Sequence, residues 1–149
     1  MLAIDRELKA LVEKLNEQKI PHALCGGLAM AVHGHPRSTR DIDLVAFRGS
    51  TTEIEKIANE MGYKSTAKPM QFAGGQVAIH RVTKTDPESE DFLPLDILTF
   101  EPSIENSITF EEADWQGVKL RVVSRKDLIR IKKIRNSHQD QADIEKLSS

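Results

Sequence analysis

The hydrophobic and polar positions of this chain follow the helical period in some segments and the strand period in others. Residues 4–19 carry apolar side chains at helical spacing, which predicts an amphipathic helix that ends at Pro21. A short apolar run at 23–25 predicts a strand, and the apolar run at 28–32 predicts a short helix. Asp41 then opens a second strand, whose following residues are largely apolar.

Two motifs mark the beginnings of later helices. Thr52 and Glu55 have the spacing of a capping box, which predicts a helix that stops at Gly62. Ser124 and Asp127 repeat this spacing at the beginning of a C-terminal helical segment. The other elements that we expect are a strand at 75–83, an acidic loop at 86–91, strands at 93–100 and 118–123, and a closing helix at about 140–147.

Helices and strands intermix along the whole chain, so the sequence predicts an α/β or α+β fold with a mixed β-sheet. We expect the helices to pack mainly on one face of this sheet and to leave its other face open for a site. No linker or repeat divides the chain. We therefore expect residues 1–149 to form a single domain, with a C-terminal helical segment from about 124.

Gly26 and Gly27 lie where the first strand turns into the short helix. Such a turn favours residues without a Cβ, because the backbone bends sharply and an anion can then approach it closely. The N–H groups at the beginning of the helix, together with the positive end of its dipole, favour a phosphate. Two turn glycines alone are a weak indication, since glycines are also common in purely structural turns.

Asp41 and Asp43 alternate with the apolar residues Ile42 and Leu44. Because side chains alternate along a strand, both carboxylates point to one face, while Ile42 and Leu44 point into the core. Neighbouring carboxylates repel each other unless a cation lies between them. Oxygen ligands of this kind suit Mg²⁺ or Mn²⁺, which bind to a few carboxylates and to substrate phosphates. A solvated strand end is the alternative interpretation, and the apolar continuation of the strand argues against it.

Asp96 is the one charged residue in the apolar run 93–100. A buried aspartate is costly unless it is paired or binds a metal. We therefore expect this strand to lie beside the strand of Asp41, so that three carboxylates share one open face of the sheet. Three such groups can hold divalent cations, bind a triphosphate and activate an acceptor hydroxyl for in-line displacement.

These residues resemble the nucleotidyltransferase fold of the DNA polymerase β superfamily. The resemblance is carried by Gly26-Gly27, the short helix, the segment Pro-Arg-Ser-Thr-Arg at 36–40, Asp-Ile-Asp-Leu at 41–44 and the later strand aspartate. The helical tail from Val123 onwards is also similar, although less specifically. Within the superfamily, the chain most resembles small bacterial proteins of the abortive-infection AbiEii type and their minimal relatives.

The resemblance implies Mg²⁺ or Mn²⁺ as the cofactor and an NTP as a substrate, and it implies a role for each matching residue. The catalytic and metal-binding residues would be Asp41, Asp43 and Asp96, the last of which would complete the metal site or act as a general base. The nucleotide-binding residues would be Gly26, Gly27, Arg37, Thr39, Arg40 and Lys132, with Asp140 and Asp143 supporting the site. Many relatives have Gly-Ser at the glycine pair, so any phosphate contact at Gly27 must come from its backbone N–H.

Several basic residues also favour a nucleotide-binding site at the carboxylates. Arg37 and Arg40 are close to Asp41 in sequence, and Lys132 follows an apolar position of the last long helix. Together they could form a local positive funnel for a nucleotide or an RNA end. Most charges of the run 125–135 are more simply the solvated face of a helix.

Composition and charge fit a small intracellular enzyme. The chain has 149 residues, a net charge of −2 and one cysteine, which argues against a globally basic nucleic-acid binder and excludes an internal disulfide. The N-terminus is charged and helical in pattern rather than a signal peptide, and no apolar run approaches membrane-spanning length. We therefore expect a cytoplasmic protein.

Two classes of function fit these features. The first is a Mg²⁺-dependent nucleotidyltransferase that moves a nucleoside monophosphate from an NTP to a hydroxyl of an RNA end, a protein or a small molecule. Such an enzyme could be part of a toxin–antitoxin system, and its partner would then be a cognate antitoxin. The second class is a nucleotide-binding or regulatory module with little or no turnover, because only two helices follow the site and could hold an acceptor. A helix-turn-helix regulator is a weaker alternative, since it leaves the carboxylates without a purpose.

Overall fold

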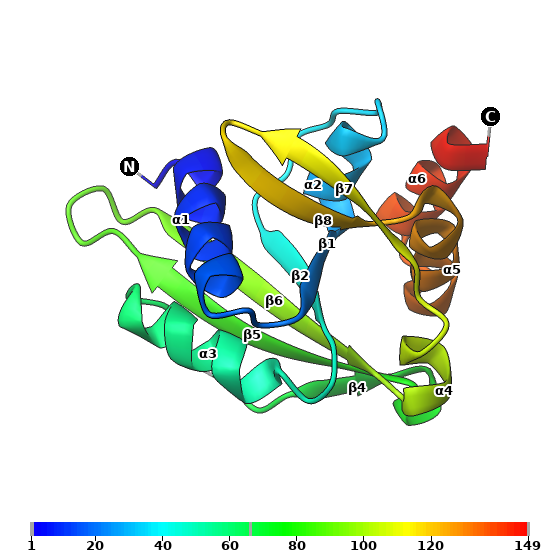
Figure 1. Cartoon of the computed structure of the whole chain (residues 1–149), viewed down its shortest axis with the longest axis horizontal. Coiled ribbons are helices and arrows are strands. Elements are labelled where there is room, and N and C mark those ends of the chain that lie inside the picture. Colours follow the sequence, from blue (N-terminus) through cyan, green and yellow to red (C-terminus); the bar gives the residue numbers. More distant parts are fainter. Residues whose placement is uncertain (1, 66, 149) are drawn as a thin grey trace.

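A computed structural model describes residues 2–65 and 67–148, and it confirms the mixed α/β architecture (Figure 1). The strands are β1 (His22–Cys25), β2 (Ile42–Ala46), β3 (Lys64–Ser65), β4 (Met70–Phe72), β5 (Val77–Thr85), β6 (Phe92–Phe100), β7 (Phe110–Trp115) and β8 (Val118–Val123). The helices are α1 (Ile4–Glu17), α2 (Gly26–Val32), α3 (Thr51–Glu60), α4 (Pro102–Glu105), α5 (Arg125–Arg135) and α6 (His138–Ser148), with a 3-10 turn η1 at Ala73–Gly75.

The strands form one mixed sheet in the order β3-β5-β6-β2-β1-β8-β7, with β4 also paired to β5. Helices α1 and α3 lie side by side across one face of this sheet (Figure 1). Helix α1 buries Leu8, Leu11, Val12 and Leu15, which are the apolar positions that predicted it. Helix α2 packs against β1 and β2, while α5 and α6 pack against each other at one end of the sheet.

The central strand β2 positions the candidate site because it lies between β1 and β6. It pairs antiparallel with β1 and parallel with β6, so that Asp43 lies opposite Cys25 on one side and opposite Asp96 on the other. The expected neighbourhood of the two aspartate strands is therefore confirmed. Leu44 and Ile97, the next residues of the two strands, are fully buried. The period of two then turns both carboxylates to the opposite face.

The capping box predicted at Thr52 is wrong. Helix α3 begins at Thr51, and its N-cap residue Ser50 makes no capping hydrogen bond. The Ser50 hydroxyl instead donates to the carbonyl oxygen of Pro21 and accepts from the N–H of Phe47. It thus joins the two chain segments that flank β1 and β2, a tertiary contact that the local spacing could not reveal. The predicted stop at Gly62 is confirmed, since α3 ends at Glu60.

One of the two hydrogen bonds expected for the second capping box is present. The Ser124 side chain accepts a hydrogen bond from the N–H of Asp127 at the beginning of α5. The carboxylate of Asp127 does not return this bond to the Ser124 backbone. It accepts instead from the N–H and the hydroxyl of Thr109, at 2.7 and 2.6 Å, and so ties α5 to the segment before β7.

Other differences from the predicted elements have a common cause. Strands β3, β4 and β7 were not predicted, and most of their side chains are exposed, so none of them carries a clear apolar alternation. Strand β5 begins at Val77 rather than at residue 75, because η1 precedes it. Helix α2 begins at Gly26 rather than at residue 28. Exposed edge strands and short turns depend on their neighbours more than on their own hydrophobic pattern.

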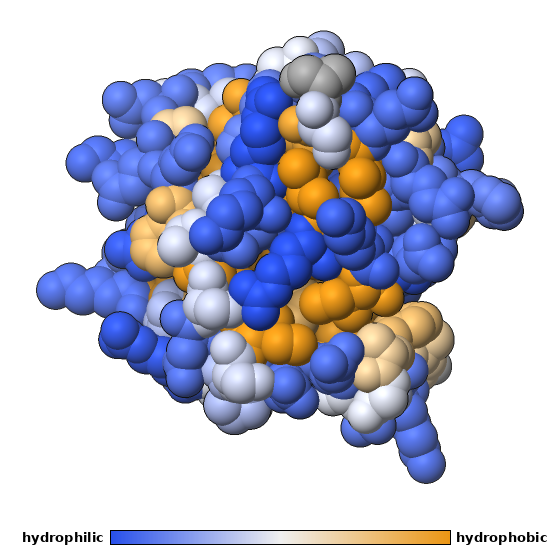
Figure 2. Space-filling model, turned by 90° about the vertical axis from the view of Figure 1, so that its right-hand side faces the viewer, coloured by the Kyte–Doolittle hydropathy of each residue, from blue (hydrophilic) through white to orange (hydrophobic). Residues whose placement is uncertain are grey.

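The side of the molecule that carries α4, α5 and α6 exposes hydrophobic side chains between hydrophilic ones (Figure 2). A pocket of about 610 Å³ lies there, lined by Gln76, Ile104, Lys126, Ile129, Arg130, Lys133 and Ile134. It combines an apolar floor with three cationic side chains. Among the residues that the structure describes, no helix has the length and hydrophobicity that a membrane span requires.

Candidate functional site

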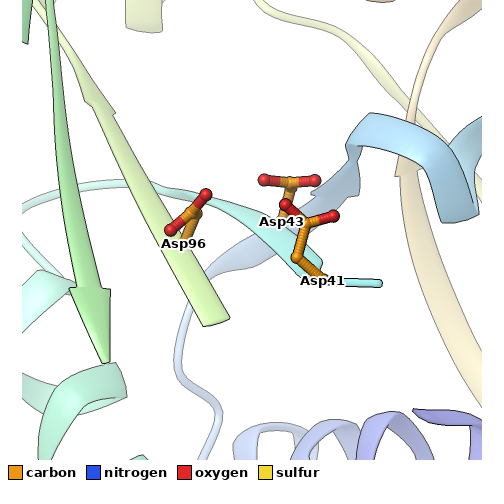
Figure 3. Close-up of side chains that lie close together, drawn as sticks. All are labelled: Asp41, Asp43 and Asp96. Carbon is orange, nitrogen blue, oxygen red and sulfur yellow. The ribbon is translucent and has the colours of Figure 1, made fainter. Parts of the chain in front are cut away.

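Asp41, Asp43 and Asp96 converge at the centre of the sheet (Figure 3). One carboxylate oxygen from each residue lies within 4.8 Å of the other two. Asp43 and Asp96 are buried, with 4% and 2% of their surface exposed, whereas Asp41 precedes β2 and is partly exposed. The structure thus brings together the three carboxylates that the sequence singled out, and their catalytic role stays a prediction.

Asp43 is the least compensated member of this acidic cluster. Its Oδ1 is buried and has no hydrogen-bond partner within the described part of the chain. Burial, followed by the charges of Asp41 and Asp96, raises the pKa of Asp43 to about 7, although Arg135 and Lys132 act in the opposite direction. A buried carboxylate oxygen without a partner, beside two further carboxylates, is stabilised by a divalent cation. The residues present therefore fit Mg²⁺ or Mn²⁺.

Asp96 has a cationic partner that the sequence analysis missed. Arg81 on β5 lies opposite Asp96 in the antiparallel pairing of β5 and β6. Its guanidinium donates two hydrogen bonds, from Nε to Oδ1 at 2.7 Å and from Nη2 to Oδ2 at 2.9 Å. Nη2 also lies 4.0 Å from Oδ2 of Asp41. The hydrogen bonds to Asp96 raise the pKa of Arg81 above its usual value. In the sequence, the only indication of this pair was a cationic residue within a largely apolar predicted strand. The register of β5 against β6 is what shows that this residue lies opposite Asp96.

The two glycines make room for side chains of the site itself. Gly26 has φ +71°, and a Cβ there would overlap with Oδ2 of Asp43. A Cβ on Gly27 would lie 2.8 Å from Oγ1 of Thr39 and 3.0 Å from Nη1 of Arg37. A side chain at either position would therefore require these neighbouring side chains to move. This is a structural reason for the glycine pair that the sequence analysis did not foresee, and the predicted phosphate contact remains a prediction.

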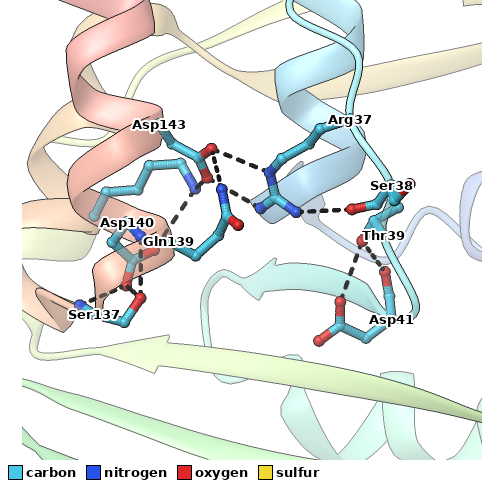
Figure 4. Close-up of polar contacts among 9 residues, drawn as sticks. Arg37, Ser38, Thr39, Asp41, Ser137, Gln139, Asp140 and Asp143 are labelled. Atoms are coloured by element: carbon cyan, nitrogen blue, oxygen red, sulfur yellow. Dashed lines mark hydrogen bonds and ion pairs between the residues drawn. The ribbon is translucent and has the colours of Figure 1, made fainter.

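A buried ion-pair network binds the segment before β2 to the C-terminal helices (Figure 4). Arg37 donates to both carboxylate oxygens of Asp143, from Nε to Oδ1 at 3.1 Å and from Nη2 to Oδ2 at 3.0 Å. Nζ of Lys132 lies 2.9 Å from Oδ2 of Asp143 and 3.7 Å from Oδ1 of Asp140. Burial acts to raise the pKa of Asp143, but hydrogen bonds from Lys132, Arg37 and Gln139 outweigh it and hold this pKa below its usual value.

The nucleotide-binding residues predicted from the sequence thus fall into two groups. Arg37 and Lys132 are held by the network, and the Lys132 side chain is only 3% exposed. Thr39 lies at the acidic cluster, where its hydroxyl is 3.3 Å from the backbone oxygen and from Oδ1 of Asp41. Arg40 is exposed. Asp140 and Asp143 hold Lys132. Their role in supporting the site, and the contact of each basic residue with a nucleotide, remain predictions.

Comparison of the sequence with models of protein families identifies one matching family. The profile described as aminoglycoside-2″-adenylyltransferase matches residues 7–87, which is more than half of the 149 residues. The matched region contains Gly26, Gly27, Asp41 and Asp43, and it ends before Asp96. No curated protein sequence is significantly similar to the chain.

Solved structures share the fold at low sequence identity. The lincosamide antibiotic adenylyltransferase LnuA, solved with lincomycin bound, is 16% identical, with a TM-score of 0.60 over 97% of this chain and 96% of that one. ANT(2″)-Ia, solved in complex with adenylyl-2″-tobramycin, is 13% identical, with a TM-score of 0.63 over 95% and 86% of the two chains. An antigenic nucleotidyltransferase-like protein from Paracoccidioides brasiliensis is 20% identical, with a TM-score of 0.57 over 93% and 72%. The nucleotidyltransferase fold is therefore confirmed, while the narrower likeness to AbiEii-type proteins stays a prediction.

Gly26→Ala tests the steric role of the first glycine. We expect it to lower the free energy of unfolding by about 1–2 kcal/mol through the left-handed backbone and by about 1–3 kcal/mol more through the overlap with Asp43. Gly49→Ala is the matched control, because Gly49 has φ +72° and nothing within 4 Å of a built Cβ. Urea denaturation of both variants measures the difference. Equal losses of stability would show that Gly26 is needed only for its backbone conformation.

Asp43→Asn tests the electrostatic cost of the acidic cluster. The pKa of Asp43 is about 7 in the folded protein and 3.8 ordinarily, so the folded state binds a proton more tightly. This group therefore favours folding at low pH and progressively loses that contribution as the pH rises from about 4 to 7. With divalent ions chelated, we expect Asp43→Asn to stabilise the protein by roughly 1–3 kcal/mol more at pH 8 than at pH 5. Asp114→Asn, at an exposed position of β7, is the control for an ordinary aspartate substitution.

Proposed function

The chain belongs to the aminoglycoside-2″-adenylyltransferase family and is a nucleotidyltransferase, and we propose that it transfers a nucleoside monophosphate from an NTP to a hydroxyl of a small molecule. The observation that carries the proposal is the convergence of three carboxylates, with one buried Asp43 oxygen left without a partner. The small-molecule acceptor is supported by LnuA and ANT(2″)-Ia, whose structures hold lincomycin and adenylyl-2″-tobramycin. An RNA end and a protein hydroxyl are the alternative acceptors.

The acidic cluster supplies the proposed metal site. Asp41, Asp43 and Asp96 would hold Mg²⁺ or Mn²⁺ through their carboxylate oxygens. When bound, such a cation would supply positive charge next to the triphosphate and to the transition state of phosphoryl transfer. Such a site would also relieve the repulsion among the three carboxylates, since Asp43 has no other compensating hydrogen bond at Oδ1 within the described residues.

The proposed reaction is an in-line displacement at the α-phosphorus of the NTP. The acceptor oxygen forms a bond to this phosphorus, and the bond between the phosphorus and the bridging oxygen of pyrophosphate breaks, so that pyrophosphate leaves. We assign the acceptor proton to Asp96, the carboxylate contributed by β6. Both oxygens of Asp96 also accept a hydrogen bond from Arg81.

The residues around the glycine pair would bind the triphosphate. Gly26 and Gly27 begin α2 next to the acidic cluster, and Gly27 offers a backbone N–H without a side chain. Thr39 and Arg40 lie on the segment that leads to Asp41. The network around Asp143 attaches this segment to α6, so we propose that the two C-terminal helices and the sheet act as one catalytic domain over residues 1–149. A role beside a cognate antitoxin stays a prediction from the resemblance alone.

The function is tested by incubating the purified protein with each α-labelled NTP and Mg²⁺, in the presence of candidate acceptors. The acceptors are aminoglycosides, lincosamides, total bacterial RNA, and a lysate fractionated into proteins and small molecules. Anionic small molecules are included because the pocket beside α5 carries Lys126, Arg130 and Lys133. We expect the wild type to label a small molecule and the Asp41→Ala/Asp43→Ala variant to label nothing. Label on RNA or protein would replace the proposed acceptor, and NTP binding without transfer would favour the regulatory module.

Asp96→Asn separates chemistry from binding. We expect the turnover rate to fall by roughly 10²- to 10⁴-fold, as is typical for the loss of a general base, and the NTP affinity measured by calorimetry to fall by much less, because Asp41 and Asp43 remain to hold the cation. Asp114→Asn on the exposed strand β7 serves as the control for an ordinary aspartate substitution. Unchanged turnover of Asp96→Asn would give Asp96 a purely structural role.

A further inference from the structure

Arg81 occupies the position of a cation within the acidic cluster, and we propose that it is a displaceable counter-ion that competes with a divalent cation for Asp96. The inference rests on the proposed metal site, and it adds a residue that sets the affinity of that site. In this role Arg81 is a positioning residue. It acts on the reaction through Asp96 and through the cation that Asp96 would bind.

The competition follows from the geometry of the pair. Arg81 donates to both oxygens of Asp96, at 2.7 and 2.9 Å, so the carboxylate has no oxygen that is not already bonded to the guanidinium. Nη2 also lies 4.0 Å from Oδ2 of Asp41, which adds an attraction to a second member of the cluster. Bidentate, charge-assisted pairs are the stronger hydrogen bonds of proteins. A cation that takes an oxygen of Asp96 therefore either shares it with the guanidinium or displaces one of these bonds, and in both cases the positive charge of Arg81 opposes its binding.

The displacement is feasible because Arg81 reaches the cluster from solvent. Its side chain is 48% exposed, whereas that of Asp96 is 2% exposed. The guanidinium can therefore leave without opening the core, and water solvates it as it leaves. Arg37 differs in this respect, since its side chain is 21% exposed and its partner Asp143 is also bonded to Lys132 and Gln139. The network around Asp143 is therefore more difficult to open than the pair of Arg81 and Asp96.

The counter-ion has a clear physical purpose. Three carboxylates within 4.8 Å of one another repel, and two of them are removed from water. Arg81 compensates the charge of the cluster before any cation arrives, and its two hydrogen bonds hold the Asp96 carboxylate in its orientation. It should therefore have opposite effects on two measurable quantities. It stabilises the metal-free protein, and it weakens the affinity for the cation.

The decisive experiment measures Mn²⁺ binding by calorimetry and by the electron paramagnetic resonance signal of free Mn²⁺, without any nucleotide. It compares the wild type with Arg81→Met, which keeps much of the side-chain length and removes the charge, and with Arg81→Lys, which keeps the charge and removes the bidentate geometry. We expect Arg81→Met to bind Mn²⁺ roughly tenfold more tightly, the factor that corresponds to the loss of one competing charge-assisted hydrogen-bonded pair. The Mn²⁺ affinity of Arg81→Lys should lie between those of the wild type and Arg81→Met.

Arg130→Met is the matched control. Arg130 is 41% exposed, and its Nη1 lies 3.7 Å from Oδ1 of the fully buried Asp127, so it is also a half-exposed arginine beside a buried aspartate. Its partner is outside the acidic cluster, and its removal should leave Mn²⁺ affinity unchanged. Thermal unfolding with chelator and with saturating Mn²⁺ gives the second readout. Arg81→Met should be less stable than the wild type in chelator, and Mn²⁺ should raise its melting temperature more than that of the wild type.

The outcomes separate this inference from the proposed function. Tighter Mn²⁺ binding by Arg81→Met, with Arg130→Met unchanged, supports the displaceable counter-ion. Equal or weaker binding by Arg81→Met, with the wild-type affinity still lost in Asp43→Ala, overturns the inference and leaves the metal site standing. Mn²⁺ binding that does not depend on Asp43 in any variant overturns the metal site and the inference together.

Discussion

The repulsion among three carboxylates is the constraint to which the rest of the site responds. The parallel pairing of β2 with β6 places Asp43 beside Asp96, and Asp41 completes the cluster from the residue before β2. Strand pairing fixes the backbones of Asp43 and Asp96 side by side, so their charge has to be compensated at this point of the sheet. Arg81 compensates Asp96, while Asp43 keeps one oxygen without a partner among the described residues. This asymmetry is the strongest indication that the cluster is arranged for a cation.

The surrounding structure serves the same cluster by steric means. Gly26 leaves the volume that the carboxylate of Asp43 fills, and Gly27 leaves the volume beside Thr39 and Arg37. A motif that suggested a cradle for phosphate is therefore first a motif of close packing around an aspartate and its neighbours. The two interpretations are compatible, because the same missing side chains also leave the backbone N–H groups open to a ligand.

Two ion-pair systems of different character flank the cluster. The network of Arg37, Lys132 and Asp143 is buried, has several donors for each carboxylate and joins segments that are far apart in sequence. Breaking such a network leaves buried charges without partners, so it holds the C-terminal helices to the sheet. The pair of Arg81 and Asp96 has one exposed member and can open at lower cost. The proposed reaction would benefit from both, since the frame would have to stay in place while cofactor and substrate bind at the cluster.

The sequence by itself determined the fold class, the central strands and the three aspartates, because buried strands and amphipathic helices carry a periodic pattern that is local. It also indicated that Asp96 needed a partner, since an isolated charge in an apolar strand is costly. It could not supply Arg81, because only the register of β5 against β6 shows which residue faces Asp96. For the same reason Lys132 was expected at the phosphates, and the structure places its ammonium group between Asp140 and Asp143. Contacts between distant segments, and the exposed strands β4 and β7, were decided by tertiary structure, since no local pattern encodes the neighbour across a sheet or between helices.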